Sequence, residues 1–398
     1  MPKEGVPPDD LDALPTSSFS ALRLRLAPLL PSGEEKGQTQ AGEVGRGPRE
    51  EPSFPPTVRF RTVKSLEIVQ RALHFGKPPR LPVKFDLLGV SDCAGLWLGA
   101  PASFSPSVKN EDEWGCVWVK TGLPNMGQVK GHPLEDLSRM DRMKVPDYDD
   151  DSRYKQVEEG LVWAEKEGKY VEVGIFMVLF ERMHTLHGFE NVLAGLLDDR
   201  PAMEALADRI VGVHLEFIDN IGRRFGKRVH GFTMTDDWGT QKAAFIGLPL
   251  WLDFFLPRYK RLYDRMHHWG YDVWLHSCGK VTELVEGFIR AGANAANLQQ
   301  PRALGIEEMG RRYRGRITFE SLADIQATLP TGDRRKVEED AEALAANWMD
   351  PRGGFVFSDY GDPAALGIRD DSIKRHMYAC FSRASERIYG EPLPPPTP

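Results

Sequence analysis

Hydrophobic and polar positions follow two alternating patterns through the middle of the chain. Short apolar runs rich in β-branched and aromatic residues predict buried strands, and longer stretches with apolar residues three or four positions apart predict helices. The two patterns succeed one another, as in a series of strand–helix units. The predicted strands cover 81–89, 170–180, 228–235, 271–275, 295–298, 316–319 and 354–358, and the predicted helices cover 65–75, 201–225, 249–269, 284–290, 305–313, 337–348 and 372–389.

Serial units of this kind favour a closed barrel over an open sheet. The sequence contains no repeat of 20–50 residues, and no G-x-G-x-x-G motif follows a first strand, so a dinucleotide-binding open sheet is the weaker interpretation. We therefore predict an α/β fold, a single-domain (β/α)8 TIM barrel.

The two ends of the chain differ in composition from its middle. Residues 1–57 are polar and rich in Gly and Pro, and residues 390–398 are rich in Pro. Such segments bury too little apolar area to offset the loss of chain entropy, so both are predicted to be disordered tails. The barrel is then expected to span residues 58–389.

Charge and cysteine content exclude several classes of protein. The 398 residues carry a net charge of -7, so no basic excess indicates nucleic-acid binding, and no apolar run is long enough for a membrane span. The nearest approach to a signal peptide, 21–30, is interrupted by Arg23 and Arg25. The four cysteines, widely spaced, predict a reducing, cytoplasmic location rather than a disulfide scaffold; they are Cys93, Cys116, Cys278 and Cys380.

Polar residues gather where the predicted strands end. In a parallel barrel these positions meet at one mouth, where binding and catalysis take place. This concentration is the main indication of an active site, and it comprises Asp86, Glu181, Arg182, Asp236, Asp237, His276, Cys278, Gln299, Gln300, Glu320, Ser358, Asp359 and Tyr360.

His276 and Cys278 form the sharpest of these motifs. They follow the strand at 271–275 directly, and residues i and i+2 of an extended chain point to the same side. An imidazole nitrogen and a thiolate could therefore share one ion, and Zn²⁺ accepts this mixture of ligands. The alternative is a small buried cysteine beside a hydrogen-bonded histidine.

Two acidic motifs accompany the histidine and cysteine. Alternation sends Asp236 and Asp237 to opposite faces, so one is expected to enter the pocket as general base, substrate ligand or metal ligand. The alternative is that this motif caps the N-terminus of a following helix. The segment 357–362 offers further carboxylate oxygens, and its alternative is a turn rich in Asp and Gly.

Several ordered motifs resemble the uroporphyrinogen decarboxylase superfamily, over about residues 58–389. The resemblance implies a (β/α)8 barrel with its pocket at the C-terminal mouth, and one of two activities. One branch decarboxylates uroporphyrinogen without a cofactor, and the other comprises zinc-dependent methyltransferases that use corrinoid cobalt. The motifs are DEWGCVW at 112–118, MGQV-x-x-HPL at 126–134, FERMHTLHGFENVL at 180–193, DDWGTQ at 236–241, HSCGKV at 276–281 and NLQQP at 297–301.

The details favour the methyltransferase branch. The decarboxylases carry a basic FMRQAGRY-type segment, whereas the comparable region here reads PVKFDLL at 82–88, and its Asp86 would repel a polyanionic porphyrinogen. His276 and Cys278 match two zinc ligands of the methyltransferases. The third ligand of that branch, a later cysteine, is missing because 356–362 reads VFSDYGD, so Asp359 or Asp362 is expected to replace it.

The resemblance and the motifs together predict a corrinoid-linked methyltransferase that acts on a small molecule. Its methyl group would be carried by a separate corrinoid protein, since the chain lacks a D-x-H-x-x-G corrinoid motif, and a homodimer is the expected assembly. The alternatives are a cofactor-free decarboxylase that uses Asp86 or Asp237 to stabilise positive charge, and a non-catalytic binding barrel. The predicted roles are zinc ligands for His276, Cys278 and Asp359, catalysis for Asp237, Asp236 and Asp86, and substrate binding for Trp238, Gln300, Glu320, Tyr360 and Arg182.

Overall fold

The structure is a computed structural model that describes residues 63–120, 127–362, 364–368 and 371–396. The N-terminal tail predicted at 1–57 and the last two residues lie outside the described residues.

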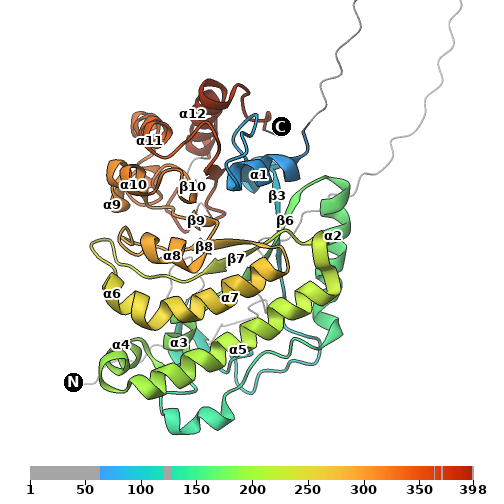
Figure 1. Cartoon of the computed structure of the whole chain (residues 1–398), viewed down its shortest axis with the longest axis vertical. Coiled ribbons are helices and arrows are strands. Elements are labelled where there is room, and N and C mark those ends of the chain that lie inside the picture. The colour runs from blue at the N-terminus through green and yellow to red at the C-terminus, as the bar shows by residue number, and fades with distance from the viewer. Residues whose placement is uncertain (1–62, 121–126, 363, 369–370, 397–398) are drawn as a thin grey trace, which may run out of the picture.

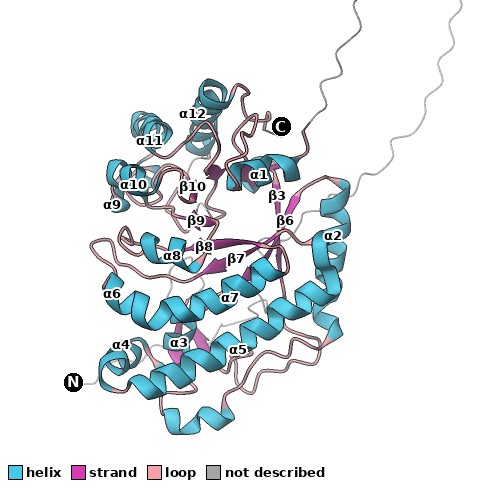
Figure 2. Cartoon of the chain, in the orientation of Figure 1, coloured by secondary structure: helices cyan, strands magenta, loops and turns pink. Residues whose placement is uncertain are grey.

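Within these described residues, eight strands joined by seven parallel pairings form the barrel. It lies at the centre of the molecule (Figure 2). A short antiparallel strand, β2 (Val90–Ser91), lies at its edge beside β1. The predicted (β/α)8 barrel is therefore confirmed. In spatial order the parallel strands are β1 (Val83–Phe85), β11 (Phe355–Ser358), β10 (Thr318–Ser321), β9 (Ala295–Asn297), β8 (Asp272–His276), β7 (Gly231–Thr235), β6 (Tyr170–Ile175) and β3 (Cys93–Trp97).

Helices cover the outside of the barrel, with α5 and α7 packed side by side and α11 packed against α12 (Figure 1). Within the described residues, no helix combines the length and apolar composition needed to cross a bilayer. The helices are α1 (Ser65–Leu73), α2 (Lys155–Lys166), α3 (Phe180–His187), α4 (Phe189–Asp198), α5 (Arg200–Phe225), α6 (Leu248–Leu250), α7 (Leu256–His268), α8 (Val285–Ala291), α9 (Pro301–Leu304), α10 (Ile306–Tyr313), α11 (Arg334–Asn347) and α12 (Ser372–Tyr389).

Successive side chains along each strand alternate in direction: one faces the outer helices and the next fills the inside of the barrel. The lowest filling layer is apolar and includes Tyr170, Trp274 and Val356, which pack against Val69 and Leu73 of α1. Helix α1 thus contributes apolar side chains to the layer at the N-terminal ends of the strands.

Above this layer lies a buried cluster of charges. The Lys84 ammonium is 2.7 Å from a Glu172 carboxylate oxygen and 3.1 Å from one of Glu320, and it lies 4.9 Å from the centre of the Trp274 ring. Although burial opposes it, the charges of Glu172 and Glu320 raise the pKa of Lys84. The lysine therefore remains charged and holds together β1, β6 and β10.

Asp92 closes the barrel between β1 and β3. Its backbone N–H donates to the Val83 carbonyl at 2.7 Å, and its carboxylate accepts from the Val83 N–H at 2.9 Å. The same carboxylate is bound by both terminal nitrogens of Arg80, at 2.6 and 2.7 Å, and by the Ser65 hydroxyl at 2.6 Å. One buried side chain thus supports the seam at which the first and second barrel strands meet.

Seven barrel strands overlap the predicted segments, although β8 ends one residue and β10 two residues beyond them, and the eighth, β3, was not predicted. Its sequence CAGLW mixes small residues with only two large ones, so it gives a weak strand pattern. A second sheet, β4 (Val117–Val119) with β5 (Gln128–Gly131), is an antiparallel hairpin. Trp118 of this hairpin stacks on Phe176 just beyond β6, at the same end of the barrel as the site residues.

The described part of the C-terminal tail differs from the predicted disorder. Leu393 is buried, its N–H donates to the Ser382 hydroxyl, and the Tyr378 hydroxyl donates to the Pro394 carbonyl. The Pro-rich segment therefore lies against α12, because one apolar side chain and a few backbone hydrogen bonds anchor it there.

Replacing Asp92 with alanine is expected to lower the free energy of unfolding by about 3–5 kcal/mol, because Arg80 would remain buried without its counter-charge. Ser65→Ala removes a single hydrogen bond to the same carboxylate and is expected to cost about 1 kcal/mol. Urea unfolding followed by circular dichroism measures both. A loss below about 1 kcal/mol for Asp92→Ala would contradict the structural role assigned to this seam.

Candidate metal centre

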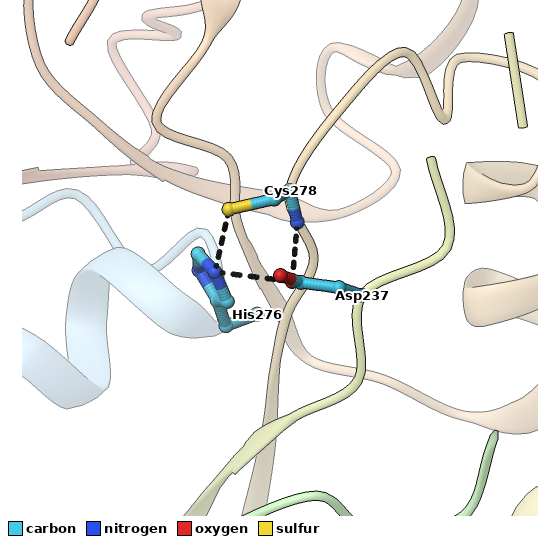
Figure 3. Close-up of side chains that lie close together, drawn as sticks. All are labelled: Asp237, His276 and Cys278. Carbon is cyan, nitrogen blue, oxygen red and sulfur yellow. Dashed lines mark hydrogen bonds and ion pairs between the residues drawn. The ribbon is translucent and has the colours of Figure 1, made fainter. Parts of the chain in front are cut away.

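Three potential metal ligands meet where β7 and β8 end. Thr235, the last residue of β7, pairs with His276, the last residue of β8. Asp237 and Cys278 each lie two residues beyond that pair, so both side chains return to the barrel mouth. In Figure 3 the imidazole, the thiol and the carboxylate point toward one another.

The ligand atoms are at the separations that one small ion requires. His276 Nε2 lies 3.3 Å from Cys278 Sγ and 3.5 Å from Asp237 Oδ1, and the three ligand atoms lie within 4.8 Å of one another. Adjacent ligand atoms around tetrahedral zinc are about 3.3–3.6 Å apart, given bonds of about 2.0–2.3 Å. The geometry of these residues therefore fits Zn²⁺ with an open position on the side of the mouth.

A chain of hydrogen bonds fixes which histidine nitrogen faces the ion position. The Asn297 side-chain N–H donates to the Glu320 carboxylate at 2.6 Å, so its carbonyl oxygen is turned toward His276 Nδ1, 2.9 Å away. A carbonyl oxygen only accepts, so Nδ1 carries the proton. The lone pair is then on Nε2, the nitrogen that faces Cys278 and Asp237.

The loop that carries Cys278 is anchored at both sides of the cysteine. The Gln300 side-chain amide oxygen accepts from the Gly279 N–H at 2.5 Å, and the Ser277 hydroxyl accepts from the Trp238 N–H at 3.0 Å. Gly279 has φ +84°, and a Cβ there would collide with the Gly239 carbonyl. The Cys278 N–H donates to Asp237 at 2.7 Å, which sets the thiol and the carboxylate relative to each other.

Asp236 supports the site rather than facing its opening. Its fully buried carboxylate accepts from the backbone N–H groups of Phe180 at 2.8 Å and Glu181 at 2.6 Å, and from the hydroxyl of Tyr259. Burial raises the pKa of Asp236 to about 7. The predicted catalytic carboxylate therefore caps the first turn of α3, a helix that precedes it in the chain rather than the following helix of the capping alternative.

The immediate surroundings of the three ligands are acidic. Burial, followed by the charges of Asp237 and Asp236, raises the pKa of Glu181 well above its ordinary value, and Glu181 Oε2 has no hydrogen-bond partner within the described residues. Burial and the neighbouring Asp237 and Glu181 also raise the pKa of the Cys278 thiol. Without a cation the thiol stays protonated, so the site favours a bound positive charge.

Asp359, the expected third ligand, is not part of this group. Its buried carboxylate is paired with Lys374 of α12 at 2.9 Å, and burial raises its pKa to about 6 against the opposing charge of Lys374. Because the lysine occupies this carboxylate, the acidic group beside His276 and Cys278 is Asp237 instead.

The other predicted residues are divided between the mouth and the core. Burial, followed by the nearby charges of Cys278 and Asp237, raises the pKa of Tyr360. Because these two neighbours lie at the mouth, the Tyr360 phenol lies there too. Asp86 is exposed at the first turn after β1, and Glu320 belongs to the charge cluster inside the barrel. Trp238, expected to bind substrate, is fully buried and stacks on Phe180 with ring centres 4.3 Å apart.

Arg182 lies beside the segment that leads into β4. Its guanidinium is 4.7 Å from the centre of the Trp114 ring and 3.6 Å from an Asp112 oxygen, and its Nε has no hydrogen-bond partner within the described residues. His214 of α5 lies against the same tryptophan, with ring centres 5.7 Å apart. Burial and the charge of Arg182 lower the pKa of His214 to about 3.

Sequence reasoning gave no role to two residues that the geometry brings to the site. Asn297 lies in the NLQQP motif at a strand end, but nothing in the sequence shows that its side-chain amide bonds His276. Glu181 follows a predicted strand, and only the fold shows that Asp236 and Asp237 are its neighbours.

Comparison with known proteins yields similarity in structure alone. No family model and no curated protein sequence matches the chain. A methyltransferase from Methanosarcina mazei has a TM-score of 0.56 at 13% identity, covering 80% of this chain and 98% of that one. D-psicose 3-epimerase in the presence of D-fructose has a TM-score of 0.36 at 12% identity, covering 59% and 84%.

Replacing His214 with glutamine is expected to reduce the loss of stability in acid. The unfolded histidine titrates near 6.5 and the folded one near 3, so its contribution is full above pH 6.5 and is lost progressively as the pH falls toward 3. The free energy of unfolding of His214→Gln should fall by roughly 2 kcal/mol less than that of the parent between pH 7.5 and 5. Urea titrations at both pH values measure this difference.

The control for His214→Gln is His268→Gln, an exposed histidine at the end of α7. This variant should follow the parent's dependence on pH. If His214→Gln also does so, His214 is not the buried neutral group described above.

Proposed function

We propose that the chain is a metal-dependent methyltransferase that transfers a methyl group between a corrinoid on a separate protein and a thiol or other heteroatom of a small molecule. The observation that carries this proposal is the meeting of Asp237, His276 and Cys278 at the barrel mouth with mutual ligand distances suited to Zn²⁺. The similarity in fold to a methyltransferase and the H-x-C motif support the choice of reaction.

The donor set and its surroundings both fit a divalent cation. One neutral imidazole, one thiolate and one carboxylate would leave a zinc site with two compensating negative charges and one open position. When bound, the metal lowers the pKa of a thiol or hydroxyl ligand and so supplies a nucleophile at neutral pH.

The protein's own residues orient and protect this site. Asn297 keeps the proton of His276 on Nδ1, and Gln300 holds the loop that presents Cys278. The Glu181 carboxyl, whose pKa is raised, retains a proton beside Asp237 and lowers the repulsion between the two acids. Tyr360 and Asp237 then form the polar border that a small substrate would contact.

The acidic character of the mouth also bears on the competing decarboxylase. Asp237 lies at the ligand position, and the positive charge of Lys374 is already paired with Asp359. A substrate with many carboxylates would meet the Asp237 carboxylate there and find no free positive charge on Lys374 to offset the repulsion. Release of CO₂ from uroporphyrinogen by the purified protein would overturn the proposed reaction.

Metal content and methyl transfer test the proposal together. Cys278→Ser is expected to lose one equivalent of zinc per chain by elemental analysis, and to lose demethylation of free methylcobalamin by a small thiol, followed by the change in cobalt absorbance. Cys116→Ser is the matched control, because Cys116 is a buried thiol that bonds the Thr185 carbonyl instead. A Cys278→Ser variant with unchanged metal and turnover would remove the basis for the proposal.

Asn297→Ala is expected to weaken zinc binding by about 10- to 100-fold, because it releases the proton of His276 Nδ1 from its partner. Competition with a chromophoric chelator measures this affinity. Asn347→Ala, which removes an amide from the outer helix α11, is the control and should bind zinc as the parent does. Equal affinity in both variants would show that Asn297 does not orient the histidine.

A further inference from the structure

A second group of metal-binding side chains lies on the outside of the barrel, between α11 and α12. His376 and Cys380 are four residues apart, so they share one face of α12. Glu338 of α11 faces them, and the two helices pack side by side in Figure 1. These elements are separate from those that carry Asp237, His276 and Cys278.

The separations resemble those at the barrel mouth. His376 Nε2 lies 3.1 Å from Glu338 Oε1 and 3.7 Å from Cys380 Sγ, and the three ligand atoms lie within 4.8 Å of one another. Tetrahedral zinc requires adjacent nitrogen, oxygen and sulfur ligands about 3.3–3.6 Å apart. An ion could thus enter with shifts of a few tenths of an ångström in side-chain positions.

The three residues become progressively more exposed from the core to the solvent. Cys380 is 4% exposed, the His376 side chain is 17% exposed and the Glu338 side chain is 51% exposed. A thiol on the inner side and a carboxylate on the outer side give an ion a route from water. They also leave a fourth position on the exposed side for a water molecule.

One cation competes for the sulfur. A terminal nitrogen of Arg383 lies 3.3 Å from Cys380 Sγ. Arg383 is exposed and one turn further along α12, so its long side chain can turn into the solvent when an ion binds. The arginine therefore sets the affinity of the group without blocking it.

We propose that Glu338, His376 and Cys380 form a second divalent-metal site, suited to Zn²⁺, which ties α12 to α11. The tie acts on the helix that also carries Lys374, whose ammonium bonds Asp359 and the Tyr360 carbonyl at the barrel mouth. Metal at the outer site would therefore stabilise the helix that supports the last βα loop. This site is independent of the proposed methyl transfer.

Cobalt substitution separates the two sites. Co²⁺ bound to a thiolate gives a charge-transfer band in the near ultraviolet, and metal-free protein titrated with Co²⁺ is expected to bind two equivalents. Cys380→Ser and His376→Ala should each bind one. Cys278→Ser should keep a thiolate band, which the double variant Cys278→Ser, Cys380→Ser loses.

Arg383→Gln gives a readout that a simple His–Glu ion pair would not produce. Removing the competing cation is expected to raise the affinity of the outer site several-fold and to leave the number of equivalents unchanged. Added Zn²⁺ should also raise the melting temperature of Cys278→Ser but not that of the double variant.

The proposal is overturned if Cys380→Ser binds as many equivalents as the parent, or if folded Cys278→Ser shows no thiolate band. Comparison of the parent with Cys380→Ser decides the question even if Cys278→Ser does not fold. If only the site at the mouth fails, the parent binds one equivalent that disappears in Cys380→Ser and persists in Cys278→Ser. Failure of the outer site and failure of the proposed function are thus distinct results.

Discussion

The pairing of Lys84 with Glu172 and Glu320 inside the barrel is the constraint on which the rest of the structure depends. A charge buried without a partner costs several kcal/mol, so the three strands that carry these residues must be in register. A shift of one residue in β1, β6 or β10 would turn the side chain toward the helices and leave its partners unpaired. Correct closure of the barrel and neutralisation of its interior are therefore a single requirement.

The same cluster extends upward into the candidate metal centre. Glu320 binds Lys84 with one oxygen and Asn297 with the other, and Asn297 in turn holds the proton of His276. The orientation of the imidazole is thus connected to the charge balance of the barrel core. Correct register of the barrel strands therefore orients His276, and the loop after β8 then places the Cys278 thiol beside it.

The fold was predictable to the extent that local pattern reveals it. Long runs such as that of β6 identify buried strands, because both faces of a parallel sheet are covered and most of its residues are apolar. The exception is β3, whose five residues include Ala and Gly and so give a weak apolar pattern. A turn through β2 joins it to β1. Lys84, Glu172 and Glu320 are ordinary charged residues in the sequence, since only long-range register shows that they meet.

Some residues of the site could likewise be recognised from the local pattern, whereas others depend on contacts between distant segments. His276 and Cys278 were recognisable because alternation along a strand places both on one side, and the same alternation separates Asp236, which caps α3, from Asp237, which faces the histidine. The choice of Asp359 as third ligand failed to account for Lys374, fifteen residues away on α12. A carboxylate already neutralised by a buried lysine gains less from a metal ion than one set among other acids. Competition between cations for carboxylates, which depends on the packing of distant helices, therefore decides which aspartate is free to bind.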